Sequence, residues 1–90
     1  MPKPVVAYTT QWCPDCTRSR RVLQQTGVPF VEIDIEEIEG AENAMRALNG
    51  GSGKVPTVLV GERILIEPSD QELRCALQEH FHSVPPRALE

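Results

Sequence analysis

The chain has 90 residues, of which 40% are hydrophobic and 24% charged, and this composition is typical of one small globular domain rather than of a disordered chain. Its net charge of −4 at pH 7 gives no indication of nucleic acid or an anionic membrane as a partner. No apolar run approaches the roughly 18 residues that a membrane-spanning helix needs. The first residues also lack the long apolar segment and cleavage motif of a signal peptide. We therefore expect a cytoplasmic monomer.

Apolar patterning and turn residues predict seven elements along the chain. Gly27 and Pro29 end the first helix, and a run of Asn and Gly at 49–51 ends the second. Gly61 and Glu62 form a tight turn between the last two strands. In chain order we expect a strand at 5–8, a helix at 14–26, a strand at 30–35, a helix at 36–49, strands at 55–60 and 63–67, and a last helix opening at Ser69.

This order, β-α-β-α-β-β-α, predicts an α/β domain with a mixed four-stranded sheet flanked by three helices. The first two strands run parallel through a right-handed crossover, and the last two form an antiparallel hairpin. We assign residues 1–83 to the domain and 84–90 to a flexible tail that begins near two adjacent prolines. Buried stripes are expected on the second helix (Ala44, Met45, Leu48) and on the last helix (Leu73, Ala76, Leu77, Phe81). Ser69 and Glu72 have the spacing of a capping box.

Two cysteines in the stretch "CPDC" mark the most informative site, because a close cysteine pair in a reducing compartment is more often redox-active or metal-binding than a static crosslink. Cys13 falls where the N-cap of the first helix would be, and Pro14 suits the first helical position. The helix N-terminus would stabilise a thiolate on Cys13, which makes this residue the expected nucleophile. Cys16, one turn later on the face that packs on the sheet, suits the resolving role.

Charged neighbours act in both directions on this site. Asp15 opposes a thiolate on Cys13, whereas Arg18, Arg20 and Arg21 add positive charge. We expect all three arginines to be exposed and individually weak, as on an ordinary solvated helix face.

Other pairings of the cysteines are less well supported. Structural zinc takes four ligands, and the only further soft candidates, Cys75, His80 and His82, lie at the opposite end of the chain without C-x-x-C spacing. We therefore expect no metal. Cys75 falls between two predicted buried leucines but off the apolar stripe, as a bystander or as a site of intermolecular oxidation. The histidines suit the end of the last helix, where positive charge is favourable.

Two further positions keep two interpretations each. Pro56 in "KVPTV" suits either a trans proline that starts a strand or a cis Val55–Pro56 bond that turns the Val55 backbone toward the cysteines. Trp12 either covers the redox site and stacks on a substrate or packs within a loop.

The C-x-x-C between the first strand and the first helix, the element order and the V-P dipeptide that opens the third strand together resemble a glutaredoxin-class member of the thioredoxin superfamily. The resemblance covers nearly all of residues 4–82. Within that class "YTTQWCPDC", "NGGSGKVPTV" and "EPSDQEL" most resemble mycoredoxins, which act on mixed disulfides with mycothiol-type thiols. The resemblance implies a thioredoxin fold, a cis Pro56, Cys13 as nucleophile and Cys16 as resolving thiol. It also implies a substrate groove that includes Trp12, Pro14, Asp15, Val55, Pro56, Ser69 and Asp70.

The sequence departs from ordinary glutaredoxins where they bind the γ-glutamyl end of glutathione. A Gly-Gly-x-Asp stretch precedes the last helix in those proteins, and "EPSDQ" stands there in this chain. The expected activity is reduction of protein disulfides or S-thiolated proteins. The expected cosubstrate is a low-molecular-weight thiol of the mycothiol, glutathione or bacillithiol type, with no tightly bound cofactor. One alternative is an NrdH-type redoxin that carries electrons from a thioredoxin reductase to ribonucleotide reductase. The other is a dimer that holds an Fe–S cluster through Cys13 and external thiols.

Overall fold

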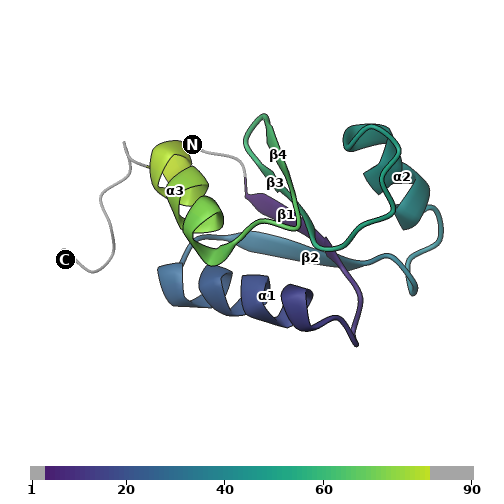
Figure 1. The fold of residues 1–90 in the computed structure, drawn as a ribbon, viewed down its shortest axis with the longest axis horizontal. Coiled ribbons are helices and arrows are strands. Elements are labelled where there is room, and N and C mark those ends of the chain that lie inside the picture. The colour runs from purple at the N-terminus through teal and green to yellow at the C-terminus, as the bar shows by residue number, and fades with distance from the viewer. Residues whose placement is uncertain (1–3, 82–90) are drawn as a thin grey trace.

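The computed structural model describes residues 4–81, which form seven elements in the predicted order (Figure 1). The predicted α/β class, the four-stranded mixed sheet and the three helices are confirmed. The elements are β1 (Val5–Thr9), α1 (Pro14–Thr26), β2 (Phe30–Asp34), α2 (Ala41–Leu48), β3 (Thr57–Val60), β4 (Arg63–Ile66) and α3 (Asp70–Phe81).

The sheet has the strand order β2-β1-β3-β4, which places β1 at its centre. β1 runs parallel to β2, with Val5 opposite Phe30 and Thr9 opposite Asp34, as a helical crossover requires. β1 is antiparallel to β3, and β3 is antiparallel to β4 through the turn at Gly61, whose φ is 63°. The C-terminal end of β1 therefore lies beside the start of β3, although the two segments are far apart in sequence.

One apolar cluster joins the sheet to α1 and α3. Leucines 23, 73 and 77 pack with alternate residues of the two central strands, because successive strand side chains point to opposite faces. In Figure 1, α1 and α3 lie near each other and α2 lies apart from both. The buried members of the cluster are Val5, Ala7, Val22, Leu23, Val58, Val60, Leu73, Ala76 and Leu77, with Phe81 partly buried against them.

Local signals fix the ends of α1 and α3. Cys13 is the N-cap of α1 with an extended backbone, Pro14 follows at the first helical position, and Gly27 ends the helix with φ 75°. At α3, the Ser69 amide donates to Glu72 Oε1 at 3.0 Å and the Glu72 amide donates to Ser69 Oγ at 3.1 Å. The predicted capping box is confirmed.

The second helix is shorter than predicted. Residues 36–40 form turns, in which the amides of Glu37 and Ile38 donate to the Asp34 carbonyl, and α2 begins only at Ala41. Gly40 at φ 82° interrupts the chain immediately before it, since a left-handed residue cannot continue a right-handed helix. The buried residues of α2 are Ala41 and Met45, so the expected stripe was wrong at Ala44 and Leu48, which are exposed.

Other boundaries differ by one or two residues: β2 ends at Asp34, β3 begins at Thr57 and β4 ends at Ile66. None of the helices within residues 4–81 is long and apolar enough to cross a membrane. His82, the predicted domain end at residue 83 and the predicted tail at 84–90 lie outside the described residues.

Candidate active site

Cys13 lies at the junction of β1 and α1, where the helix begins. Its Sγ accepts a hydrogen bond from the Cys16 amide at 3.2 Å, and its thiol donates to the Val55 carbonyl at 3.8 Å. Only 8% of the residue is exposed. The predicted N-cap position is confirmed, and the sulfur lies at the helix N-terminus, where the first backbone N–H groups have no partner within the helix.

Cys16 lies one turn into α1 and is fully buried, as expected from its place on the packed face. Burial raises the pKa of the Cys16 thiol to about 12, because a thiolate loses its hydration there, and the hydrogen bond with Cys13 adds to this rise. The Thr10 backbone N–H, which donates to the Cys16 sulfur, acts in the opposite direction. Both cysteines are reduced in this structure. Cys16 is therefore a protonated thiol at neutral pH.

The segment before β3 faces the cysteines through its backbone. The Val55–Pro56 bond is cis, so the isomer implied by the resemblance is confirmed. Pro56 is fully buried, and its carbonyl accepts from the Glu67 amide at 2.8 Å. Val55 thus supplies a carbonyl that the Cys13 thiol contacts.

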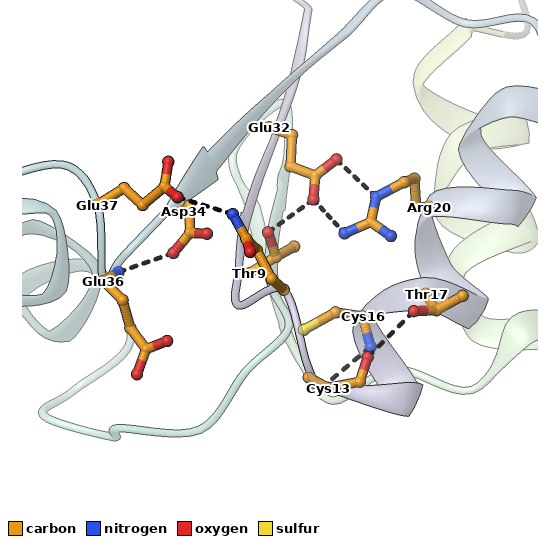
Figure 2. Close-up of polar contacts among 10 residues, drawn as sticks. Thr9, Cys13, Cys16, Thr17, Arg20, Glu32, Asp34, Glu36 and Glu37 are labelled. Atoms are coloured by element: carbon orange, nitrogen blue, oxygen red, sulfur yellow. Dashed lines mark hydrogen bonds and ion pairs between the residues drawn. The ribbon is translucent and has the colours of Figure 1, made fainter.

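Trp12 directly precedes Cys13 in the chain and is 71% exposed. Its indole Nε1 donates to Glu36 at 2.9 Å, and the neighbouring Gln11 donates to Glu37 at 2.7 Å. These two hydrogen bonds join the loop that leads into Cys13 to the acidic turn at 36–40. Figure 2 shows this turn at the end of β2. Of its two interpretations, packing within a loop does not describe Trp12, because its ring is largely open to solvent.

Asp15 and Asp70 are bridged by one arginine. Arg18 Nη1 lies 3.0 Å from Asp15 Oδ1, and Arg18 Nε lies 3.1 Å from Asp70 Oδ1. All three side chains are nearly half exposed, so each pair is weak on its own. The bridge nevertheless joins the C-x-x-C segment to the Ser69–Asp70 turn at the start of α3. Asp15 and the Ser69–Asp70 turn, both predicted to line the groove, are thereby brought to one edge of the molecule.

Arg20, a second arginine of α1, is less exposed than predicted. Arg20 Nε donates to Glu32 Oε1 at 2.7 Å, Arg20 Nη2 also contacts Glu32 Oε2, and Thr9 Oγ1 donates to Oε2 at 2.7 Å (Figure 2). The Arg20 hydrogen bonds hold the pKa of the Glu32 carboxyl below its usual range. Thr9 is almost fully buried, and the Arg20 and Glu32 side chains are each 28% exposed. The prediction of three equivalent exposed arginines was therefore wrong for Arg20.

Thr10 lies at the site, although the sequence did not predict a contact between this residue and Cys16. It is 4% exposed, its backbone N–H contacts the Cys16 sulfur, and its Oγ1 is buried without a hydrogen-bond partner among residues 4–81. A polar residue directly after a buried strand was the available signal, but the sequence does not say which way its side chain points.

No group of three or more histidine, cysteine or carboxylate side chains within residues 4–81 is arranged to hold a metal ion. Cys75 is exposed on α3, in keeping with its place off the apolar stripe. His80 packs its ring edge-to-face on Phe81 at 4.6 Å between centroids and lies against Gly61, so it contacts the β3–β4 turn.

Comparison with known proteins agrees with this geometry. The glutaredoxin family model matches residues 5–65. A glutaredoxin of Pseudomonas aeruginosa is 48% identical over 61 residues, which cover 66% of this chain and 69% of that protein. A Mycobacterium tuberculosis protein named as a glutaredoxin is 35% identical over 71 residues, covering 78% of this chain and 84% of that protein.

The crystal structure of a glutaredoxin from Archaeoglobus fulgidus superposes with a TM-score of 0.72 at 27% identity, covering 90% of this chain and 87% of that one. The sequence relatives and the Archaeoglobus fulgidus structure agree on the family and on the fold. The chain belongs to the glutaredoxin family, whose members are thiol-disulfide oxidoreductases.

Proposed function

We propose that Cys13 and Cys16 form a redox couple that reduces protein disulfides or mixed disulfides between proteins and a low-molecular-weight thiol. The observation that carries this proposal is the contrast between the two sulfurs. Cys13 Sγ accepts an amide hydrogen bond at the start of α1, and Cys16 is a fully buried thiol one turn below it. A thiolate is the attacking species in disulfide exchange, and a buried thiol that reacts second suits the resolving step.

The reaction proceeds in two exchanges. The Cys13 thiolate attacks one sulfur of the substrate disulfide, a mixed disulfide to Cys13 forms, and the other substrate sulfur leaves as a thiolate that takes up a proton. Cys16 then loses its proton to solvent and attacks the Cys13 sulfur, and the remaining substrate thiolate leaves. The substrate gains two electrons and the chain ends with a Cys13–Cys16 disulfide. A small thiol or a reductase returns it to the dithiol.

Groups around Cys13 support a role in holding the substrate. The Val55 carbonyl lies beside the sulfur, Trp12 offers an exposed ring next to it, and the Ser69–Asp70 turn is joined to Asp15 through Arg18. We assign substrate contacts to Trp12, Pro14, Asp15, Val55, Pro56, Ser69 and Asp70.

A trapping experiment tests the redox couple. In a Cys16→Ser variant the mixed disulfide on Cys13 cannot be resolved internally, so the bound protein or small thiol stays attached and is identified by mass spectrometry. The matched control is the Cys13→Ser, Cys16→Ser double variant, which keeps Cys75 and should trap nothing comparable. Equal adducts on the two variants would contradict the assignment of Cys13.

The source of electrons separates this proposal from an NrdH-type function. One observation favours that alternative: Asp70, in the stretch where glutaredoxins bind a small thiol, is already engaged by Arg18 at 3.1 Å. We expect turnover when NADPH is coupled through a small-thiol reductase and its thiol. Turnover only with a thioredoxin reductase would overturn the small-thiol proposal in favour of the NrdH-type function. Iron–sulfur absorbance in anaerobically purified protein would support the cluster-binding alternative.

A further inference from the structure

Arg20 occupies a place in α1 that sets it apart from the other arginines of that helix. It follows Cys16 by four residues, which is one helical turn, so the two side chains leave the same face of the helix. Figure 2 shows both projecting from α1 toward β1 and β2. By contrast, Arg21 is exposed, and Arg18 reaches outward to Asp15 and Asp70.

The Arg20 guanidinium is held in place by a carboxylate that accepts three hydrogen bonds, two of them from Arg20. Both oxygens of Glu32 accept from Arg20, and Oε2 also accepts from the buried Thr9 hydroxyl. Glu32 lies opposite Ala7 in the β1–β2 ladder, so the sheet itself fixes the carboxylate. A bidentate pair anchored at both ends immobilises a side chain that would otherwise be flexible.

Arg20 is the member of this pair that interacts electrostatically with the two sulfurs. The pKa of Arg20 is raised mainly by its hydrogen bond with Glu32, and the charges of Cys16 and Cys13 also contribute. Arg20 in turn lowers the pKa of Cys16, in opposition to the larger effect of burial. Because the pKa of Glu32 is itself lowered, this carboxylate is a weak base and does not suit the removal of the Cys16 proton.

We propose that Arg20, held by Glu32 and Thr9, is a positioning residue for the second half of the reaction, in which it stabilises the thiolate that Cys16 becomes as it attacks the mixed disulfide on Cys13. The proton of Cys16 passes to solvent, the Cys16–Cys13 sulfur bond forms, and the substrate thiolate leaves. Arg20 makes no bond with the reacting atoms. This inference rests on the proposed redox couple.

An aromatic disulfide whose leaving thiolate is coloured, Ellman's reagent, separates the two halves of the reaction. Attack by Cys13 releases the first thiolate, and attack by Cys16 on the resulting mixed disulfide releases the second. All variants carry Cys75→Ser, because the exposed Cys75 would release colour of its own. Stopped-flow absorbance then gives two rates from one sample.

We expect Arg20→Gln to slow the second phase about threefold for each unit by which the Cys16 pKa rises. The tenfold loss of thiolate per unit is partly offset because a more basic sulfur is a better nucleophile. The first phase should fall by a smaller factor. Arg21→Gln removes the same charge from the next residue and should leave both phases unchanged.

Two further variants separate charge from structural damage. Arg20→Lys keeps the charge and should restore most of the second-phase rate. In the Arg20→Gln, Glu32→Gln double variant, an amide pair replaces the ion pair without leaving a carboxylate unpartnered, and the second phase should remain slow. This variant also serves if Arg20→Gln alone does not fold.

The inference is overturned if the second phase of Arg20→Gln matches that of Arg21→Gln, if both phases fall by one common factor, or if Arg20→Lys is as slow as Arg20→Gln. A parent protein that releases no first thiolate would instead contradict the proposed redox couple. The two failures are therefore distinguishable in the same experiment.

Discussion

The surroundings of Cys13 and Cys16 differ more than their separation of three residues suggests. Cys13 lies at a rim of exposed groups, among them Trp12 and the Asp15–Arg18 pair, and its sulfur contacts the Cys16 amide and the Val55 carbonyl. Cys16 lies beneath it against the packed sheet, fully buried. One turn of helix thus separates a sulfur that lies beside exposed groups from one that is fully enclosed.

This difference teaches that a single helix start can assign the two roles of a redox couple. The helix N-terminus favours an anion at its first residue, whereas the packed face of the same helix favours a neutral thiol one turn later. In the proposed reaction, backbone geometry and burial therefore order the two exchanges. Substitutions can change the surroundings of Cys13 and those of Cys16 separately.

The largest effect is expected at Cys13. Cys13→Ser should abolish disulfide reductase turnover, because a hydroxyl at the rim cannot replace the thiolate and Cys16 is inaccessible to a protein substrate. A coupled assay of NADPH consumption measures this. Cys75→Ser, a change at the exposed cysteine of α3, is the control and should retain turnover.

The buried side is tested by Leu23→Ala. Leu23 is fully buried in the cluster that joins α1 to the sheet and α3, so the free energy of unfolding should fall by about 2–5 kcal/mol. Chemical denaturation measures the loss. Leu48→Ala removes the same atoms from an exposed site on α2 and should change the free energy of unfolding by less than about 0.5 kcal/mol.

The pH dependence of stability is tested at Cys16. Its pKa is raised from the ordinary value of 9.0 to about 12, so between these values the unfolded chain releases a proton that the folded chain retains. The stability contributed by the neutral thiol is fully present below pH 9 and is lost as pH rises toward 12. The slope contributed is at most about 1.4 kcal/mol per pH unit. Subtracting the curve of Cys16→Ala isolates it, and parallel curves would contradict the raised pKa.

The smallest effect is expected at the rim. Ser69→Ala removes the cap of α3, and the free energy of unfolding should fall by about 1 kcal/mol. Gln71→Ala, at an exposed position in the same first turn, is the control and should leave stability nearly unchanged. A loss at Ser69 as large as that at Leu23 would show that the rim and the core are not energetically distinct.

Local patterns were sufficient to predict the element order, the N-cap at Cys13 and the capping box at Ser69, because each depends on residues within one turn. The start of α2 was predicted too early because the acidic residues before Gly40 suit a first helical turn, whereas Gly40 in fact breaks the helix there. The Arg20–Glu32–Thr9 contacts could not be predicted. They join a helix to two strands, and only the crossover and the β1–β2 register bring the three side chains together.

The cis isomer of the Val55–Pro56 bond could not be predicted from neighbouring residues alone. Local sequence left both isomers open, and only the family resemblance favoured cis, because the choice depends on the packing of the segment against the rest of the domain. The contacts assigned to Trp12 and to the Ser69–Asp70 turn stay predictions until a substrate is identified.

The contact between the Cys13 sulfur and the Val55 carbonyl joins residues that are 42 positions apart in the chain. During synthesis, β1 and α1 leave the ribosome well before β3 exists, and until β3 pairs with β1 this sulfur has no carbonyl beside it. The surroundings of Cys13 are therefore complete only after β3 has emerged and paired with β1.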